Sequence, residues 1–371
     1  MITPKRILLA VSGMSPQIIT ETLYALVTAE QPWIPDEIHL VTTLEGRKNA
    51  ELQLLAGDRH FHQLLQEYAV EQPILFNHST IKVIQNSDGK ELEDLRTPED
   101  NEAAADCICE KVRELTQEPD TELHVSLAGG RKTMGFYAGY ALSLFGRSQD
   151  RLSHVLVSED YESLRDFFYP AKTQRVIYKV QNGISIPLDA SLAHVWLAQI
   201  PFVRLRSFLP DDALVSRAKF SEVVSFVDIM TSDQPLPVIV DLKRQQLRVG
   251  NWNIPMAPVE LAMYLAFVRR LKQGDSELVL RKNDSSEAFG KEFLQALEEV
   301  KGEMGDMERS EKTYKKGMAR EEFDSIRSRT KKAIKAVLGA QGAKKIEIQS
   351  GPHGSSTFYL ELEPSMVTVE G

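Results

Sequence analysis

The first half of the chain alternates short apolar segments with amphipathic ones, and this alternation limits the folds available to it. Residues 6–11 and 37–42 have the pattern of apolar β-strands, as do residues 80–84, 125–127 and 153–157. Segments with an apolar residue every three or four positions separate them, which indicates helices. Such repeats are typical of a parallel β-sheet covered by helices on both faces. We therefore predict an α/β fold for this half.

Helix-start and loop signals lie between the predicted strands and helices. Ser15 followed by Pro16 predicts a helix start, because Ser suits the N-cap position and Pro the first helical position. Residues 43–47 predict a loop that precedes a helix around residues 52–68. A later loop leads into a helix predicted over residues 99–115. Loops are thus expected where the strands end.

A pair of glycines, Gly129 and Gly130, lies between the fourth predicted strand and its helix. Two glycines permit a tight turn and let a ligand approach the backbone closely. The helix start also directs N–H groups at this turn, which favours an anion. Arg131 and Lys132 lie in the first helical turn, where positive charge opposes the helix dipole. A concentrated positive site and an ordinary exposed basic pair are equal interpretations of these residues alone.

Four loops are expected at the carboxyl edge of the predicted sheet: residues 12–16, 43–47, 94–101 and 128–133. In parallel sheets, ligands bind beyond this edge, where the strand order reverses. The four loops are rich in hydroxyls, glycines and cations, as a ligand that carries phosphate requires. The sequence lacks G-x-G-x-x-G after the first strand and lacks the phosphate-loop pattern, so it does not support NAD or ATP in its usual loop. We expect no cofactor.

The composition describes a chain large enough for two domains. It has 371 residues, of which 42% are hydrophobic and 26% charged. No apolar run approaches the ~20 residues of a membrane span, so we expect no membrane association. Cys107 and Cys109 are two positions apart on a predicted helix and point in different directions. We therefore expect no disulfide or metal site, and a cytoplasmic location.

The second half predicts a smaller α+β domain. A helix is expected over about residues 212–229. Short antiparallel strands follow at residues 238–242, 246–249 and 252–254, and an amphipathic helix at residues 259–271.

The end of the chain predicts a polar segment, a basic helix and a hairpin. Residues 274–316 are polar, and we expect them to be mobile. A helix over residues 321–338 has apolar residues on one face and cations on the other, and residues 344–362 alternate as a hairpin with a Gly/Ser turn. The net charge is −9, but residues 305–345 hold an excess of six positive charges, which leaves the remainder at −15. The cations of the helix are Arg327, Arg329, Lys331, Lys332 and Lys335.

Five motifs of the first half together resemble a known family. They are LLAVSGMSPQIITETLYAL, LVTTLEG, DLRTPEDNEAAAD, SLAGGRKTMGFYAGYALSLFG, and HVLVSEDYE with DFFYP. In this order they are similar to the CRISPR-associated Rossmann-fold (CARF) proteins, in particular a compact branch found near type III CRISPR loci, over residues 1–205. The resemblance implies a Rossmann-like parallel sheet with helices on both faces. It also implies a homodimer that binds a cyclic oligoadenylate across its two-fold axis, and we expect the tetramer ring.

Some members of that family, the ring nucleases, also cleave the ring and switch off type III CRISPR signalling. A serine after the first strand and a lysine in the glycine-rich loop matter most in them, and the resemblance assigns these catalytic roles to Ser12 and Lys132. Cleavage needs no metal, because the 2′-hydroxyl of the RNA-like linkage is the nucleophile and the protein positions it and stabilises charge on the phosphate. The expected products are linear di-adenylates with a 2′,3′-cyclic phosphate. Binding without cleavage stays open as the alternative.

Other residues of the same loops are expected to bind the ring. They are Gly13, Ser15, Gln17, Thr43, Glu45, Arg47, Arg96, Gly129, Gly130, Arg131, Thr133 and Met134. For Glu45 and Arg47 a solvated loop is an equal alternative. For Arg96 we favour an ion pair with Asp94 that holds the loop.

The order of elements in the second half is similar to a winged helix-turn-helix domain of the response-regulator kind. DLKRQQLRVGNWNIPMAPVE matches its small sheet and first helix, which makes the basic helix the recognition helix and residues 350–356 the tip of the wing. The resemblance implies DNA contact through the five cations named above. An insertion over about residues 272–320 is longer than the usual connection, so a dimerisation or docking role is an equal alternative.

We therefore divide the chain into domains at residues 1–205 and 206–371. The alternative function is a transcription regulator that responds to the ring, binds DNA and leaves the ring intact.

Overall fold

The computed structural model describes residues 4–127, 129–162, 164–210, 214, 218–232, 236–250, 252–302, 307–352 and 355–371. The chain forms two compact units. The N-terminal unit comprises Met1–Arg206 with Arg217–Glu222, and the C-terminal unit comprises Ser207–Ser216 with Val223–Gly371. Among the residues that are described, no helix is both long and apolar enough to cross a membrane.

A six-stranded sheet forms the centre of the N-terminal unit, in the order β3-β2-β1-β4-β5-β8. The strands are β1 (Lys5–Val11), β2 (Glu37–Thr42), β3 (Ile81–Val83), β4 (Thr121–Ser126), β5 (Arg151–Val157) and β8 (Val195–Gln199). The first five are parallel to one another, whereas β8 pairs antiparallel with β5. The predicted α/β fold with a parallel sheet is confirmed, and the antiparallel edge strand is an addition.

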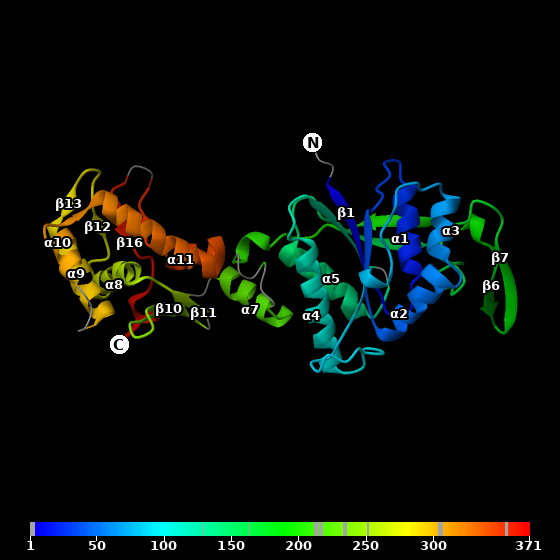
Figure 1. Ribbon diagram of the computed structural model, residues 1–371, viewed down its shortest axis with the longest axis horizontal. Helices are drawn as coiled ribbons and strands as arrows, with labels where there is room; N and C mark the ends of the chain where they lie inside the picture. Colours follow the sequence, from blue (N-terminus) through cyan, green and yellow to red (C-terminus); the bar gives the residue numbers. More distant parts are fainter. Residues whose placement is uncertain are drawn as a thin grey trace. The chain divides into compact units, whose positions relative to one another are not determined.

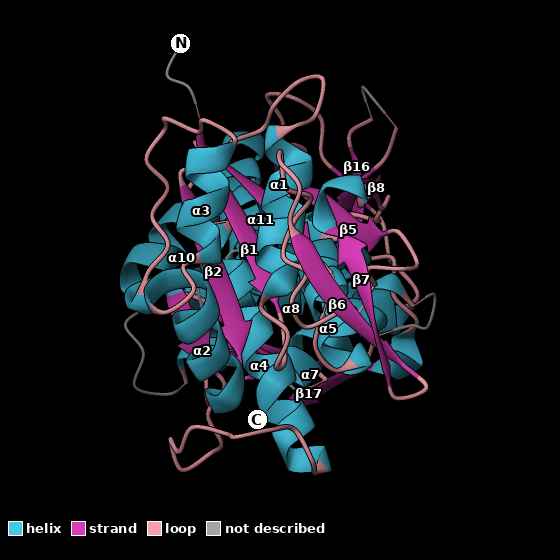
Figure 2. Cartoon of the chain, turned by 90° about the vertical axis from the view of Figure 1, so that its right-hand side faces the viewer, coloured by secondary structure: helices cyan, strands magenta, loops and turns pink. Residues whose placement is uncertain are grey.

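Helices cover both faces of this sheet (Figure 2). They are α1 (Gln17–Val27), α2 (Leu44–Ala50), a π-helical turn (Glu51–Ala56), α3 (His60–Glu67), α4 (Pro98–Leu115) and α5 (Lys132–Phe145). Helices α1 and α3 share one face, and α4 and α5 pack together on the other (Figure 1). A hairpin of β6 (Val176–Gln181) and β7 (Ile184–Asp189) precedes β8.

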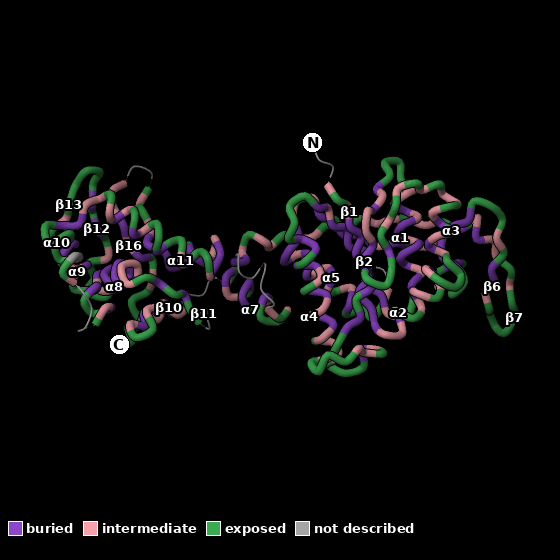
Figure 3. The backbone as a smooth tube through the Cα atoms, in the orientation of Figure 1, coloured by how far each residue is buried: buried purple, intermediate pink, exposed green. Residues whose placement is uncertain are grey.

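The continuous apolar run of β1 follows from burial on both faces. Leu8 and Ala10 belong to the core under α1, and the alternate residues Leu9 and Val11 are also fully buried. Figure 3 shows most of β1 in the colour of buried residues. Each buried Leu or Val side chain contributes about 1.5–3 kcal/mol relative to exposure. The strand is therefore fixed at the centre of the unit, and the loop that follows it is fixed with it.

Two local predictions in this unit are wrong. Residues 43–47 are not a loop, because the Thr43 hydroxyl accepts a hydrogen bond from the Gly46 N–H at 3.3 Å and α2 begins at Leu44. Ser15 does not cap α1: Pro16 occupies the N-cap position in a helical conformation, and the helix begins at Gln17. The helix predicted around residues 52–68 is divided into the π-helical turn and α3.

In its described residues, the C-terminal unit contains three small sheets and several helices. The strands are β9 (Val238–Asp241), β10 (Gln246–Val249), β11 (Trp252–Pro255), β12 (Leu278–Val279), β13 (Ser285–Ser286), β14 (Met318–Ala319), β15 (Gln349–Ser350), β16 (Thr357–Tyr359) and β17 (Val367–Glu370). The helices are α7 (Phe220–Thr231), α8 (Pro258–Gln273), α9 (Glu287–Lys301), α10 (Glu308–Tyr314) and α11 (Arg320–Ile346). The sheets are β11-β10-β9-β17, β12-β16-β15 and β13-β14. The predicted smaller α+β region is confirmed, and the winged helix-turn-helix assignment stays a prediction.

The prediction of a mobile segment at residues 274–316 is wrong for its described part. It contains α9, α10 and two short strands. The ring of Phe289 on α9 packs edge-on against Phe267 of α8, with centroids 5.6 Å apart. Apolar residues at helical spacing within a polar sequence therefore form a buried face, and residues 303–306 lie outside the described residues.

The ends of the other predicted elements also shift. Helix α11 continues to Ile346, with a non-helical residue at Gly339, so the predicted hairpin begins later, at Gln349. Of the predicted wing tip, residues 353–354 lie outside the described residues, as do residues 212–213 and 215–217 of the helix expected at 212–229.

Candidate functional site

The strand order of the N-terminal sheet reverses between β1 and β4. From β1 the chain continues to β2 and β3 on one side, then returns through α4 to β4 and β5 on the other. Two turns follow these central strands at the same edge: Ser12–Gly13 after β1 and Gly129–Gly130 after β4. In open α/β sheets this reversal opens a crevice in which ligands bind. We call these two turns the switch-point turns.

The switch-point turns pack against each other. Gly129 and Gly130 have positive φ angles of 98° and 78°. A Cβ atom on Gly130 would lie 3.0 Å from the amide nitrogen of Gly13 and 3.3 Å from the carbonyl carbon of Ser12. Both the conformation and the close approach therefore require glycine at this position. Of the loop predicted at residues 128–133, Ala128 lies outside the described residues.

Ser12, a predicted catalytic residue, is buried inside its turn. Its hydroxyl donates a hydrogen bond to the carbonyl oxygen of Ser15 at 2.7 Å. The carbonyl oxygen of Gly13 accepts a hydrogen bond from the Thr42 hydroxyl at 3.0 Å. These bonds fix the path of the chain after β1, whereas Ser15 is exposed. The catalytic role of Ser12 stays a prediction.

Helix α2 lies directly against the first switch-point turn. A Cβ atom on Gly46 would overlap the carbonyl oxygen of Gly13. Asn49, which the sequence analysis missed, donates a hydrogen bond from Nδ2 to the carbonyl oxygen of Met14 at 2.9 Å. Thr43 is buried as the helix cap. The segment after β2 and the loop after β1 are therefore in contact.

The charged residues of α2 already have partners. Arg47 forms two hydrogen bonds of 2.8 Å with the carboxylate of Glu91. Glu45 accepts a hydrogen bond from Lys48 at 2.8 Å. Both predicted ligand contacts thus take part in ion pairs within the protein.

Arg131 is also neutralised by a carboxylate. Its guanidinium donates hydrogen bonds of 2.6 Å and 3.4 Å to Asp94. These bonds to Arg131 lower the pKa of Asp94. The predicted pair of Asp94 and Arg96 is confirmed, with Nε and Oδ2 3.6 Å apart, and Arg131 is the closer partner.

Lys132 differs from these arginines. It is the first residue of α5, it is exposed, and its ammonium has no ion pair or hydrogen bond among the described residues. No side chain caps this end of α5. Thr133 is exposed beside it, and the buried Met134 places its sulfur under Gly130, where a Cβ atom would lie 3.1 Å away. The second switch-point turn therefore combines an uncapped helix start with an unpaired cation, both favourable to an anion.

A cavity of about 320 Å³ adjoins the switch-point turns, with Ser15 and Gly129 in its wall. Gln17 also lines it and donates a hydrogen bond from Nε2 to the carbonyl oxygen of Arg165 at 2.9 Å. Glu21, one turn further along α1, lies in the same cavity and was missed. Burial raises the pKa of Glu21 to about 8. The sequence feature that could have identified Glu21 is that it is a single carboxylate in an otherwise uncharged, largely apolar helix.

The five cations of the predicted recognition helix lie on α11, and three have carboxylate partners. Arg329 lies 3.8 Å from Glu260, and Lys331 donates a hydrogen bond of 2.9 Å to Glu347. The guanidinium of Arg327 lies over the ring of Phe358 and 3.9 Å from Asp324. Lys332 and Lys335 are exposed, and no partner is seen for them in the described ranges.

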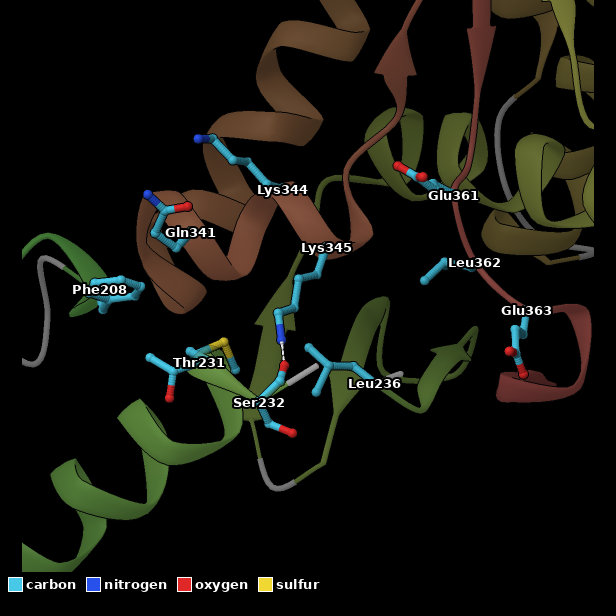
Figure 4. Close-up of a pocket in the computed structure, with 11 residues that line it drawn as sticks. Phe208, Thr231, Ser232, Leu236, Gln341, Lys344, Lys345, Glu361, Leu362 and Glu363 are labelled. Carbon is cyan, nitrogen blue, oxygen red and sulfur yellow. Dashed lines mark hydrogen bonds between the residues drawn. The ribbon is translucent and has the colours of Figure 1, made fainter. Parts of the chain in front are cut away.

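The C-terminal unit also has a cavity of about 590 Å³ between α7 and the end of α11 (Figure 4). Its Lys345 ammonium donates a hydrogen bond to the carbonyl oxygen of Ser232, just after the end of α7. A cation at the end of a helix stabilises the unpaired carbonyls there. This lysine therefore has a structural role. Within the described ranges, no group of three or more His, Cys, Asp or Glu side chains is placed to hold a metal ion.

The strand order and the packed turns define an α/β protein with an anion-suited site at its switch point. Residues 15–231 match the CRISPR-associated protein NE0113 family. The match covers more than half of the chain, which therefore belongs to this family of CRISPR-associated proteins. A comparison with curated proteins finds no match.

Proposed function

We propose that the protein binds a cyclic oligoadenylate, with the tetramer as the expected ring, at the switch-point turns and cleaves it without metal. The observation that carries the proposal is the unpaired Lys132 at the uncapped start of α5, beside the glycine turn. The family, which is CRISPR-associated, and the five motifs that resemble CARF proteins support the same ligand.

The distribution of charge favours one phosphate position. Arg47 and Arg131 are each bound to a carboxylate, so they present little net charge to a ligand. Lys132 keeps its full charge, and the α5 dipole adds a partial positive charge in the same place. A phosphate of the ring therefore binds at Gly130–Thr133.

The reaction uses the ring's own nucleophile. The 2′-oxygen forms a bond to phosphorus, the bond from phosphorus to the 5′-oxygen breaks, and the 2′-hydroxyl proton leaves to water while the 5′-oxygen takes one up. The Lys132 ammonium stabilises the charge that develops on the non-bridging phosphate oxygens. The backbone turns hold the linkage in line. The motifs contain no evident general base, so we expect slow turnover.

A second copy of the chain completes the ring site in this proposal. A cyclic tetramer has two-fold symmetry, so two copies of the switch-point turns can each bind one half. Met14 and Phe136 are 64% and 63% exposed on the loop after β1 and on α5, near the turns. Both lie beside the turns, so a second copy that binds the other half of the ring covers apolar surface there. They support a homodimer that closes over the ring.

The test is incubation of the protein with cyclic tetra-adenylate in EDTA, with products separated by chromatography and identified by mass. We expect linear di-adenylate with a 2′,3′-cyclic phosphate. Lys132→Ala lowers turnover by more than about tenfold, because it removes a transition-state contact. Lys48→Ala, which removes an exposed but paired cation from α2, stays near wild type. A ring that binds but is intact after hours at enzyme excess contradicts the cleavage step.

The alternative is a ring-responsive regulator that binds DNA through α11. Lys332 and Lys335, both exposed, favour it. The ion pairs of Arg329 and Lys331 weaken it, because those cations are already neutralised.

A further inference from the structure

The cavity beside the switch-point turns has the position and size of a pocket for one base of the ligand. Its wall includes Ser15 and Gly129, which also belong to the loops around the turns, so a ligand on the turns reaches its mouth. Its volume of about 320 Å³ lies at the lower end of the range for small-molecule pockets, about 300–1,000 Å³. In a cyclic oligonucleotide, the bases project away from the ring of riboses and phosphates. A phosphate on the second turn therefore leaves a neighbouring base free to enter the cavity.

Two polar side chains of α1 in this cavity have hydrogen-bonding atoms that pair with no residue in the described part of the chain. Gln17 and Glu21 are four residues apart and thus lie on the same side of the helix. The Oε1 atom of Gln17 is buried and accepts no hydrogen bond, while its Nε2 is held by the carbonyl oxygen of Arg165. Among the residues that the structure describes, none forms a hydrogen bond or ion pair with the carboxyl of Glu21. Native proteins satisfy most buried polar groups, so the unpaired Oε1 of Gln17 indicates a missing ligand, and Glu21 lies one turn away in the same cavity.

The protonation state of Glu21 determines whether its carboxyl can donate a hydrogen bond to a ligand or only accept one. Desolvation by burial raises the pKa of Glu21 to about 8, so the carboxyl is neutral at pH 7. A neutral carboxyl presents one O–H donor beside one C=O acceptor. The titratable or charged side chains that line the same cavity are His154 on β5, and Glu162 and Arg165 on the loop that follows it.

We infer that this cavity takes an adenine base of the ring and that Glu21 is its specificity-determining residue. The inference rests on the proposed function. The Glu21 O–H donates to a ring nitrogen of adenine, and its C=O accepts from the neighbouring amino group. The second hydrogen of that amino group is the donor that Gln17 Oε1 lacks. A base with an oxo group at this position places an acceptor against Gln17 Oε1 and is disfavoured.

The experiment measures cyclic tetra-adenylate affinity by titration calorimetry for wild type, Glu21→Gln and Glu21→Leu. Gln keeps one donor and one acceptor, so we expect an affinity within about threefold of wild type. Leu keeps neither, and the loss of a two-bond contact to the base weakens binding by more than about tenfold. Wild type also binds less tightly at pH 9.5 than at pH 7 relative to Glu21→Gln, because the ionised carboxylate loses its donor. Cyclic tetra-inosinate, which has an oxo group in place of the amino group, binds wild type more weakly.

The outcomes separate this inference from the proposed function. Equal affinity of Glu21→Leu and wild type, with Lys132→Ala still weakened, overturns the base pocket and leaves the phosphate site in place. No affinity of wild type for cyclic tetra-adenylate overturns both. Loss of binding in Glu21→Gln as well as Glu21→Leu contradicts the neutral carboxyl and assigns the ionised form to the site.

Discussion

Replacing Glu21 by Gln removes a buried ionisable group while keeping its shape, and we expect the change to stabilise the N-terminal unit. Burial raises the pKa of Glu21 from 4.5 to about 8. The unfolded chain therefore releases this proton near pH 4.5, whereas the folded chain keeps it until about pH 8. Between these values the folded state binds one more proton, so the free energy of unfolding falls as the pH rises.

The size of the effect follows from the pKa difference. One pKa unit corresponds to about 1.4 kcal/mol. At pH 7 the folded state retains a proton that the unfolded state has released, which costs about 3 kcal/mol. The cost levels off at about 4–5 kcal/mol above pH 8, and it vanishes below pH 4, where both states are protonated. Gln is neutral throughout, so the variant avoids this cost.

The assay is thermal unfolding of wild type and Glu21→Gln across the range from pH 4 to pH 9. In a domain of about 200 residues, 1 kcal/mol shifts Tm by about 2–4 °C, so the expected gain at pH 7 is about 6–12 °C. At pH 4 the two proteins should unfold together. Glu102→Gln, which changes an exposed carboxylate on α4, serves as the matched control. A difference in Tm that is the same at pH 4 and pH 9 would refute the burial of a neutral carboxyl.

Two further predictions concern the switch-point turns and the C-terminal unit. Gly130→Ala should lower the free energy of unfolding by more than about 2 kcal/mol in a denaturant titration, because Ala disfavours φ of 78° and its Cβ meets the Gly13 amide. Gly89 has the same φ with open space around it, so Gly89→Ala should cost only about 1 kcal/mol; equal losses would contradict the packing of the turns. In a gel shift with CRISPR promoter DNA, the double variant Lys332→Ala/Lys335→Ala should abolish any salt-dependent binding, and unchanged binding would exclude this face of α11.

The sequence predicts the central strands of the sheet because these strands are buried on both faces. Leu8 and Leu9 are neighbours in β1 and both are fully buried, which produces a continuous apolar run. Strand β8 gives no such signal, since it is an edge strand and its Trp196 is 54% exposed. Helix α9 has an apolar face but many charged residues, and only packing against α8 reveals that face as core. Local composition therefore predicts central elements better than peripheral ones.

The candidate site also has one part that the sequence predicts and one part that only the fold reveals. The Gly129–Gly130 turn is a local signal, because two adjacent glycines before a helix define a turn wherever they occur. Glu21 gives no comparable signal, since its environment depends on the loop after β5. Gln17 and Arg165, which meet in the wall of that cavity, are 148 residues apart. The cavity is thus a product of the folded sheet and cannot be read from either segment alone.

Among the described residues, a carboxylate partner distinguishes the cations that hold the loops from a cation that is free to bind an anion. Local composition does not show which of Arg47, Arg131 and Lys132 has a carboxylate partner in the fold. Arg47 meets Glu91 44 residues away, and Arg131 meets Asp94 37 residues away. A charge-assisted hydrogen bond to a carboxylate cancels most of the field that an arginine presents to a second anion. Removing either arginine therefore disturbs the loops first, whereas removing Lys132 changes the charge at the α5 start and leaves the fold intact. For this reason a substitution at Lys132 can distinguish a role in the chemistry from a role in folding.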